Sequence, residues 1–197
     1  MSNTYFISDT HFHHKNILKY EPSRAKELAK YLGRSEEEIL EELSLGYAGD
    51  EAKFSFLLGE HDRLLIRNWN AVVGKEDVVW FLGDFLCGKK DLAKEIAAQL
   101  QGRKRMVMGN HDNWKEEFYR SIGFEYASKY PVLLKGRFLL SHAPLPECPS
   151  PFFNVFGHIH LAHSGDVPTK AENHQCVCVE RQGFRPVRIE EFDKAGQ

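Results

Sequence analysis

Residues 4–11 read TYFISDTH, an apolar run that stops at an acid and a histidine. The run is short and rich in Tyr, Phe and Ile, a composition that is typical of a buried strand. Asp9 and His11 would then follow the end of that strand. Because they are two positions apart, an extended chain would aim both side chains to the same side. The stretch therefore predicts a strand that delivers two polar groups to one place.

The same arrangement recurs along the chain. Further apolar runs predict strands at residues 77–83, 104–109, 137–141, 151–157 and 175–180. Polar clusters close all but the last of them, namely Gly83-Asp84, Gly109-Asn110-His111-Asp112, Ser141-His142 and Gly157-His158-Ile159-His160. In α/β proteins, sites gather where strand ends bring side chains to one rim. We therefore expect these clusters to meet.

Helical patterns lie between the strands, at residues 35–43, 50–73, 89–100 and 113–123. The first of them begins with Ser35 as a predicted N-cap and has Glu38 three residues later, which is a capping-box arrangement. Strands alternating with helices predict an α/β fold around a largely buried sheet system. The length of 197 residues fits a single domain, residues 1–197, with a helical elaboration expected around residues 20–60.

The composition favours a cytoplasmic protein with reduced thiols. No stretch approaches the ~20 apolar residues of a membrane span, and the first residues do not have the pattern of a secretion signal. The four cysteines include no CxxC pair, so a thiolate zinc knuckle is not expected, and Cys176 and Cys178 are expected to pack in the core. A net charge of −2 gives no general argument for binding a polyanion.

The polar clusters have the composition of a metal site. They combine oxygen and nitrogen donors without sulfur, a set that suits Mn²⁺, Zn²⁺, Fe or Ni²⁺ better than Ca²⁺. Seven candidate ligands are too many for one ion and fit two ions about 3.5–4 Å apart, the usual device for hydrolysing phosphate esters. The donors are two aspartates, one asparagine and four or five histidines.

Five motifs occur in order along the chain: DTH at 9–11, GD at 83–84, GNHD at 109–112, SH at 141–142 and GHIH at 157–160. In this order they resemble the signature of the calcineurin-like metallophosphoesterase superfamily, and the chain looks closest to its small bacterial and phage members. The resemblance implies a four-layer α/β/β/α sandwich with mixed β-sheets. It also implies a metal-dependent phosphoric ester hydrolase that cleaves a phosphodiester or nucleotide-type substrate with a metal-activated hydroxide.

The resemblance assigns a role to each motif residue. One ion would be held by Asp9, His11, Asp84 and His160, and the other by Asp84, Asn110, His142 and His158, so that Asp84 bridges the two. His111 would be catalytic and assist the leaving group, and Asp112 would orient His111 by a hydrogen bond. His14 and Asn16 are candidate substrate-binding residues. The expected metal is manganese, with zinc, iron and nickel as alternatives.

Several residues fall outside this pattern. Cys87 stands where the family often has an aspartate, and His13 stands where the related subgroup usually has a glycine. Neither has an assigned role or is a predicted ligand. His61 lies on the apolar stripe of residues 50–73 and is expected to pack there, whereas His163 and His174 are expected in loops.

Alternative functions remain open from the sequence alone. A small phosphorylated substrate is favoured, and no membrane partner is expected. A nuclease with the same metal chemistry is the main alternative, which the near-neutral charge and the lack of a basic stripe disfavour. A non-catalytic scaffold that keeps the fold is the third, and the intact ligand set argues against it. The sequence names neither the physiological substrate nor the oligomeric state.

Overall fold

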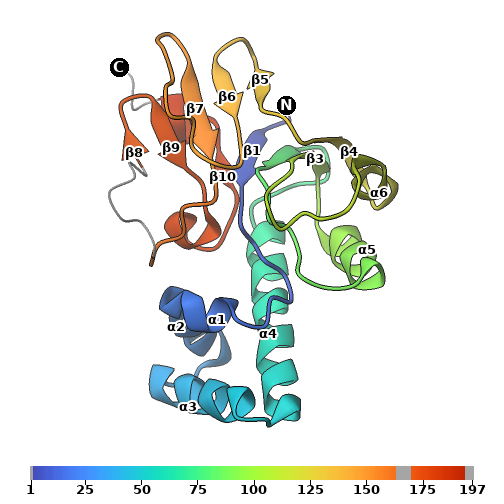
Figure 1. Cartoon of the computed structure of the whole chain (residues 1–197), viewed down its shortest axis with the longest axis vertical. Coiled ribbons are helices and arrows are strands. Elements are labelled where there is room, and N and C mark those ends of the chain that lie inside the picture. Colours follow the sequence, from blue (N-terminus) through green and yellow to red (C-terminus); the bar gives the residue numbers. More distant parts are fainter. Residues whose placement is uncertain (1, 163–169, 194–197) are drawn as a thin grey trace.

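Two five-stranded sheets form the centre of the molecule in this computed structural model, which describes residues 2–162 and 170–193 (Figure 1). The first sheet has the order β10-β1-β2-β3-β4. Its strands are β1 (Thr4–Ile7), β2 (Val78–Phe81), β3 (Arg103–Val107), β4 (Phe124–Ser128) and β10 (Val187–Arg188). Neighbouring strands from β1 to β4 pair in parallel, and β10 pairs with β1 in antiparallel fashion, so the sheet is mixed.

The second sheet has the order β5-β6-β7-β9-β8. Its strands are β5 (Val132–Leu134), β6 (Phe138–Leu140), β7 (Phe153–Phe156), β8 (Lys170–Ala171) and β9 (His174–Cys176). The three inner strands are parallel, and both outer strands are antiparallel to their neighbours. The predicted α/β architecture with mixed sheets is therefore confirmed.

One hydrophobic core lies between the two sheets. Phe6 and Trp80 of the first sheet belong to the same buried cluster as Phe138 and Val155 of the second. The rings of Phe6 and Phe138 have their centroids 6.3 Å apart. Because each sheet covers an apolar face of the other, the strand ends of both sheets are brought close together.

Helices cover the other face of the first sheet. They are α4 (Glu51–Asn70), α5 (Lys90–Gln99) and α6 (Glu116–Ser121), whose apolar faces share one buried cluster with β1, β2 and β3. The Trp69 ring of α4 stacks on Phe81 of β2 at a centroid distance of 6.3 Å. On the second sheet, Phe156 and Cys176 pack with Ile159 of the loop that follows β7.

Three more helices pack with the first half of α4 (Figure 1). They are α1 (Ile17–Tyr20), α2 (Pro22–Leu32) and α3 (Glu36–Tyr47), and a short α7 (Glu190–Asp193) follows β10. Residues such as Leu28, Ile39 and Leu57 form a buried cluster of their own in this helical part. The predicted capping box is confirmed, because Ser35 accepts a hydrogen bond from the Glu38 amide and the Glu38 carboxylate accepts one from Ser35.

The predicted strand at residues 175–180 ends early. Strand β9 stops at Cys176, and Val179–Gln182 form a 3₁₀ helix, η1. The cause is that the chain passes from one sheet to the other at Val177. Its N–H donates to Phe156 O in the second sheet at 2.7 Å, and its C=O accepts from Ser8 N beside the first sheet at 3.1 Å. A residue shared in this way cannot continue a regular strand.

The histidines outside the motifs divide as follows. His61 is fully buried on α4, as predicted, with Nε2 3.4 Å from Nη1 of Arg24. His174 begins β9 rather than lying in a loop, and His163 lies outside the described residues.

The predicted packing of Cys176 and Cys178 in the core is confirmed, since both are fully buried.

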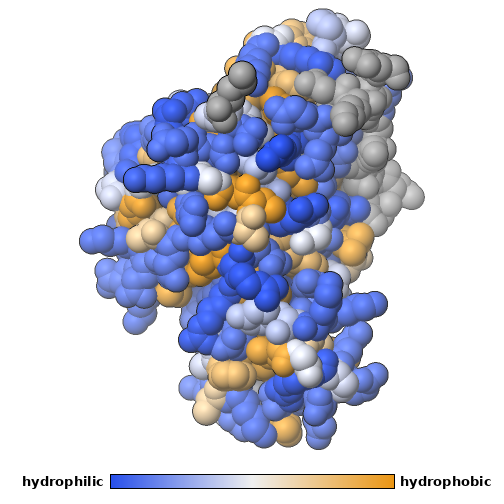
Figure 2. Space-filling view, turned by 180° about the vertical axis from the view of Figure 1, so that it is seen from behind, coloured by the Kyte–Doolittle hydropathy of each residue, from blue (hydrophilic) through white to orange (hydrophobic). Residues whose placement is uncertain are grey.

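The residues on the surface are mainly hydrophilic, as expected when the apolar side chains lie in the core. Figure 2 shows hydrophilic residues over most of the face seen from behind, with apolar residues in small separate patches. Among the helices of the described residues, none is long and apolar enough to cross a membrane.

Candidate metal centre

The seven predicted ligands lie at the carboxyl ends of five parallel strands taken from both sheets (Figure 1). Asp9 and His11 follow β1, Asp84 follows β2, Asn110 follows β3, His142 follows β6, and His158 and His160 follow β7. Because neighbouring parallel strands end at the same edge of a sheet, and the two sheets face each other, these side chains meet at one rim.

Four of these residues have a left-handed backbone. The angle φ is +56° at Asp9, +45° at His11, +59° at Asp84 and +67° at His158. The expectation that Asp9 and His11 lie on an extended chain is therefore wrong. Hydrogen bonds from Asp9 N to Gly83 O (2.9 Å) and from His11 N to Asp84 O (3.0 Å) hold the turned segment against the end of β2. Such strain costs about 1–2 kcal/mol per residue and gathers at functional sites.

Glycines let the strand ends approach this closely. A Cβ atom on Gly109 would overlap Asp84 Oδ1, and one on Gly157 would overlap both Asp9 Oδ2 and Ser8 Oγ. The first residues of GNHD and GHIH must therefore be glycines, because there is no room for a side chain at either position.

The donor atoms of the seven candidate ligands form a continuous line (the donor line), and Asp84 lies at its middle. On one side, Asp84 Oδ2 lies 3.5 Å from His11 Nε2, which in turn lies 3.2 Å from His160 Nε2. Asp9 Oδ1 completes this half, at 3.8 Å from His11 Nε2 and 3.6 Å from His160 Nε2.

The other half of the line begins at the same carboxylate oxygen. His142 Nε2 lies 3.5 Å from Asp84 Oδ2, 2.8 Å from Asn110 Oδ1 and 3.1 Å from His158 Nδ1. The second oxygen of Asp84, Oδ1, accepts a hydrogen bond of 2.8 Å from the amide of His111. Asp84 is thus fixed through one oxygen and presents the other to both halves.

These residues fit divalent cations. Asp9 is fully buried, and its Oδ1 has no hydrogen-bond partner among the residues that the structure describes. A buried carboxylate oxygen without a partner is costly, and a cation would supply one. Asp9, His11 and His160 form one group able to hold an ion, and Asp9, Asp84 and His142 form another. Ligand atoms about 3–3.5 Å apart match bonds of about 2.1 Å to a shared ion.

Two of the candidate ligand imidazoles, those of His11 and His158, have a lowered pKa. Burial, followed by the nearby charge of Arg24, holds the pKa of His11 well below its usual value. Burial, followed by the neighbouring His142, lowers the pKa of His158. His160 is different, because the hydrogen bond and charge of Glu180 outweigh burial and raise its pKa. A metal ion requires neutral imidazole, so the first two residues are ready for one at neutral pH.

Two buried residues that the sequence did not single out support His160. Glu180 Oε1 lies 3.0 Å from His160 Nδ1, and Arg24 Nε donates to the same oxygen at 2.7 Å. Arg24 also donates to the carbonyl oxygens of Asp9 (2.5 Å) and Thr10 (2.8 Å). A carboxylate behind a histidine fixes the tautomer and orientation of its ring. Arg24 therefore ties this carboxylate to the turn that carries Asp9.

The only sequence signal for Arg24 is its position. It lies four residues before Leu28 on the buried face of α2, where a charged side chain is unusual. Glu180 has no comparable signal, because it simply follows an apolar run. Burial alone would raise the pKa of Glu180, but the charge of Arg24 and the His160 contact bring it down to about 2.

The hydrogen bonds of Asp112 go to other partners than the His111 ring. Its oxygens accept hydrogen bonds of 2.7–3.3 Å from the amides of Asp84, Gly109 and Phe85 and from the Tyr119 hydroxyl. In the part of the chain that the structure describes, no hydrogen bond joins Asp112 to the His111 ring. Asp112 thus ties the turn after β2 to the turn after β3 through the amides of Asp84, Phe85 and Gly109.

A hollow of 370 Å³ opens beside the His11 end of the donor line. His111 and His14 both line it, with ring centroids 5.1 and 5.4 Å from that of His11. Asn16 is exposed just before α1 and is not among the lining residues. The structure therefore brings His14, but not Asn16, to the candidate substrate side of the site.

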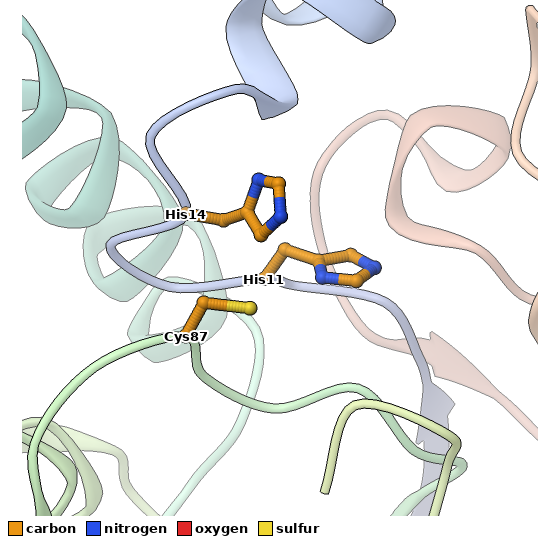
Figure 3. Close-up of side chains that lie close together, drawn as sticks. All are labelled: His11, His14 and Cys87. Carbon is orange, nitrogen blue, oxygen red and sulfur yellow. The ribbon is translucent and has the colours of Figure 1, made fainter.

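The two departures from the family pattern lie next to the site. Figure 3 shows the Cys87 sulfur beside the rings of His11 and His14, and the three side chains could together hold an ion. Burial, followed by the charge of Asp84, raises the pKa of Cys87 to about 11, so the thiol stays protonated and is a poor ligand at neutral pH. His13 turns away to Asp62, with Nδ1 3.2 Å from the carboxylate.

The match of the chain to a protein family agrees with the metal site that the arrangement of the donor atoms indicates. Residues 2–175 match the family model described as calcineurin-like phosphoesterase. The chain belongs to the calcineurin-like phosphoesterase family. The resemblance in the five motifs is thereby confirmed, and this phosphoesterase is a metal-dependent phosphoric ester hydrolase. Members of the family bind divalent metals, for which the strand-end residues form candidate ligand groups.

Proteins from an archaeon and from a phage, and one solved bacterial structure, are similar to this phosphoesterase. An uncharacterised protein of Methanocaldococcus jannaschii is 30% identical over 96% of this chain and 89% of its own length. The gene 66 protein of Mycobacterium phage L5 is 33% identical over 57% of this chain and 41% of its own length. A crystal structure of a protein of unknown function from Aquifex aeolicus shares the fold, with a TM-score of 0.63 and 24% identity over 98% of this chain and 99% of that one.

Proposed function

We propose that this phosphoesterase hydrolyses phosphodiesters at a centre of two divalent cations. The observation that carries the proposal is the position of Asp84. Its Oδ2 atom lies 3.5 Å from His11 Nε2 and 3.5 Å from His142 Nε2, which belong to the two halves of the donor line. A carboxylate oxygen that faces two separate groups of donors is what a ligand shared by two cations requires.

The ligand sets follow from the two halves. One cation would be held by Asp9, His11, Asp84 and His160, and the other by Asp84, Asn110, His142 and His158. The sets contain no thiolate, which disfavours soft metals such as Cu(I), and their carboxylate and amide oxygens are compatible with Mn²⁺, whereas the imidazoles also suit Zn²⁺, Fe and Ni²⁺. When bound, the two cations supply a nucleophile near neutral pH and neutralise charge on the phosphoryl oxygens.

The protein orients the ligand rings through their other nitrogen atoms. His142 Nδ1 lies 2.9 Å from the carbonyl oxygen of Leu82, and His160 Nδ1 lies 3.0 Å from Glu180 Oε1. In the neutral rings, acceptors in these positions select the tautomer that carries its proton on Nδ1, and they orient the Nε2 atoms towards the donor line.

His111 is the proposed general acid. Its amide donates a hydrogen bond to Asp84. Its ring lines the hollow beside His11, and the centroids of the His111 and His11 rings are 5.1 Å apart. From this place the ring would donate a proton to the leaving oxygen of a substrate whose phosphorus lies at the centre. A positioned acid of this kind contributes about 10²–10⁴-fold to the rate.

The shape of the site supports a diester. A second hollow, of 330 Å³, meets the donor line at its other end and is lined by Asn110, His142 and Lys129. The two substituents of a diester leave phosphorus in different directions, so hollows at both ends suit them. Among the described residues that line either hollow, Lys129 is the only lysine or arginine, which disfavours a long nucleic acid backbone.

Metal reconstitution tests the proposal. Metal-free protein should gain turnover of bis(4-nitrophenyl) phosphate on addition of Mn²⁺ and should cleave it faster than 4-nitrophenyl phosphate. We expect Asp84→Asn to lose bound metal and turnover together. His111→Ala should keep its metal and lose about 10²–10⁴-fold in rate. Asp91→Asn, on the exposed surface of α5, is the matched control and should change neither.

Three results would contradict the proposal. Equal turnover by metal-free and reconstituted protein would exclude metal-dependent chemistry. A faster reaction with the monoester would exclude the diester preference. Efficient cleavage of DNA or RNA that falls steeply with salt would favour the nuclease alternative.

A further inference from the structure

The thiol of Cys178 is a buried group in contact with a predicted metal ligand. Its Sγ atom lies 3.2 Å from Oδ2 of Asp9, which is 169 positions away in the sequence. Both residues are fully buried, so the contact is shielded from bulk solvent. Neither the proposed ligand sets nor the proposed general acid includes this thiol. Its place beside Asp9 lets it act on the geometry of the metal centre.

Backbone pairing fixes the position of the thiol. Cys178 forms a single parallel bridge with Ser8, the residue before Asp9. Ser8 N donates to Val177 O at 3.1 Å, and Val179 N donates to Ser8 O at 3.2 Å. The sulfur of Cys176 packs against that of Cys178 at 3.4 Å. Because the peptide groups on both sides of Cys178 are hydrogen-bonded to Ser8, the thiol is held next to the Asp9 carboxylate.

The two oxygens of Asp9 have different surroundings. An ionised carboxylate can only accept hydrogen bonds, so the thiol is the donor in its contact with Oδ2. The same oxygen accepts a hydrogen bond of 2.8 Å from the amide of His158. By contrast, Oδ1 has no hydrogen-bond partner among the described residues and lies 3.6 Å from His160 Nε2. One oxygen is thus held by the protein, and the other faces the donor line.

Both donors to Oδ2 are uncharged groups. A thiol and a backbone amide orient the carboxylate without cancelling its negative charge, whereas a lysine or arginine in their place would compete with a metal cation. Hydrogen bonds that orient metal ligands in this way matter for affinity, and their loss typically weakens metal binding about 10–100-fold.

We propose that Cys178 is a positioning residue of the metal centre, whose thiol holds Asp9 Oδ2 and thereby directs Asp9 Oδ1 to the cation beside His11 and His160. The inference rests on the proposed function, because it places a cation in that half of the donor line. It goes further by giving a role to a residue outside the ligand sets and by confining its effect to one of the two ions.

Serine and alanine at this position separate hydrogen bonding from packing. The two side chains are similar in size and smaller than cysteine, but only serine keeps a donor. In calorimetric titration of the metal-free protein with Mn²⁺, Cys178→Ser should stay close to the unmodified protein, and Cys178→Ala should bind about tenfold more weakly. The matched control is Cys148→Ala, which removes a buried thiol from the loop between β6 and β7 and should leave the affinity unchanged.

Diffraction shows which ion is affected. In crystals of Cys178→Ala grown with limiting Mn²⁺, we expect the anomalous peak beside His11 and His160 to lose occupancy and the peak beside His142 and Asn110 to keep it. A variant that merely loosened the fold would lose both peaks. Neutron diffraction from deuterium-exchanged crystals of the unmodified protein needs no variant, and should show the deuteron of the Cys178 thiol directed at Asp9 Oδ2.

The outcomes that overturn each idea are different. Equal affinity for Mn²⁺ in Cys178→Ser and Cys178→Ala would overturn the inference and leave the proposed function standing. Equal loss of both anomalous peaks, or a thiol deuteron directed away from Asp9, would have the same consequence. An unmodified protein that binds no Mn²⁺ at the donor line would overturn the proposed function and the inference together.

Discussion

Gly157 shows at the scale of one residue how closely the two sheets approach each other at the site. The space that its Cβ would occupy is filled by Asp9 Oδ2 and Ser8 Oγ. The next amide along the chain, that of His158, donates to the same Asp9 oxygen at 2.8 Å. The GHIH motif therefore lies directly against the DTH motif, and the absence of a side chain is what permits the contact.

Substitution of this glycine should affect the metal centre specifically. Gly157→Ala would push Asp9 out of place, so we expect the affinity for Mn²⁺ to fall on the order of tenfold or more. Gly33→Ala is the control, because Gly33 has φ +66° but open space around its Cβ position. That change should cost about 1–2 kcal/mol of unfolding free energy and leave metal affinity unchanged. Calorimetry and urea unfolding measure the two effects, and equal metal affinity in both variants would contradict the account.

The sequence revealed the ligands but not the residues that hold them. The motif residues are recognisable because each group is contiguous and follows an apolar run. Arg24 and Glu180 are 156 positions apart, and only the folded chain brings them together behind His160. The true partners of Asp112 were missed for the same reason, since they include backbone amides from a separate turn.

At the scale of elements, α2 connects the helical part of the molecule to the metal centre. Arg24 of α2 is fully buried and bonds to two carbonyl oxygens of the turn after β1 as well as to Glu180. The helix is therefore more than a peripheral addition, because it fixes the backbone that carries Asp9.

The contribution of this contact can be measured by substitution. Arg24→Met should cost about 3–5 kcal/mol of unfolding free energy, because it leaves the buried Glu180 without the guanidinium that offsets its charge. The control is Arg34→Met, which removes the surface pair with Glu42 and should cost at most about 1 kcal/mol. Chemical denaturation of metal-free protein compares the two. Similar losses in both variants would mean that the buried pair does not hold this part of the fold.

The sequence predicted the inner strands and missed the outer ones. Each predicted strand corresponds to an inner strand of one of the two sheets, β1, β2, β3, β6, β7 or β9. Inner parallel strands are covered on both faces and read as continuous apolar runs. The missed strands, β4, β5, β8 and β10, all lie at sheet edges. In the edge strand Phe124–Ser128 two adjacent exposed residues interrupt the buried ones, and β10 has only two residues, so these strands leave little pattern.

At the scale of the whole molecule, the metal centre lies where the two sheets meet. Asp9, His11, Asp84 and Asn110 come from the first sheet, and His142, His158 and His160 come from the second. Neither sheet alone supplies a complete ligand set for either proposed ion. Metal binding should therefore depend on the packing between the sheets, and the central claim concerns the number and position of the ions.

Anomalous diffraction from crystals of the Mn²⁺-loaded protein tests that claim most directly. The account predicts two manganese peaks about 3.5–4 Å apart, both in contact with the Asp84 carboxylate, one towards His11 and His160 and the other towards His142 and Asn110. A single peak at the rim, or a second peak beside Cys87 instead of Asn110, would contradict it.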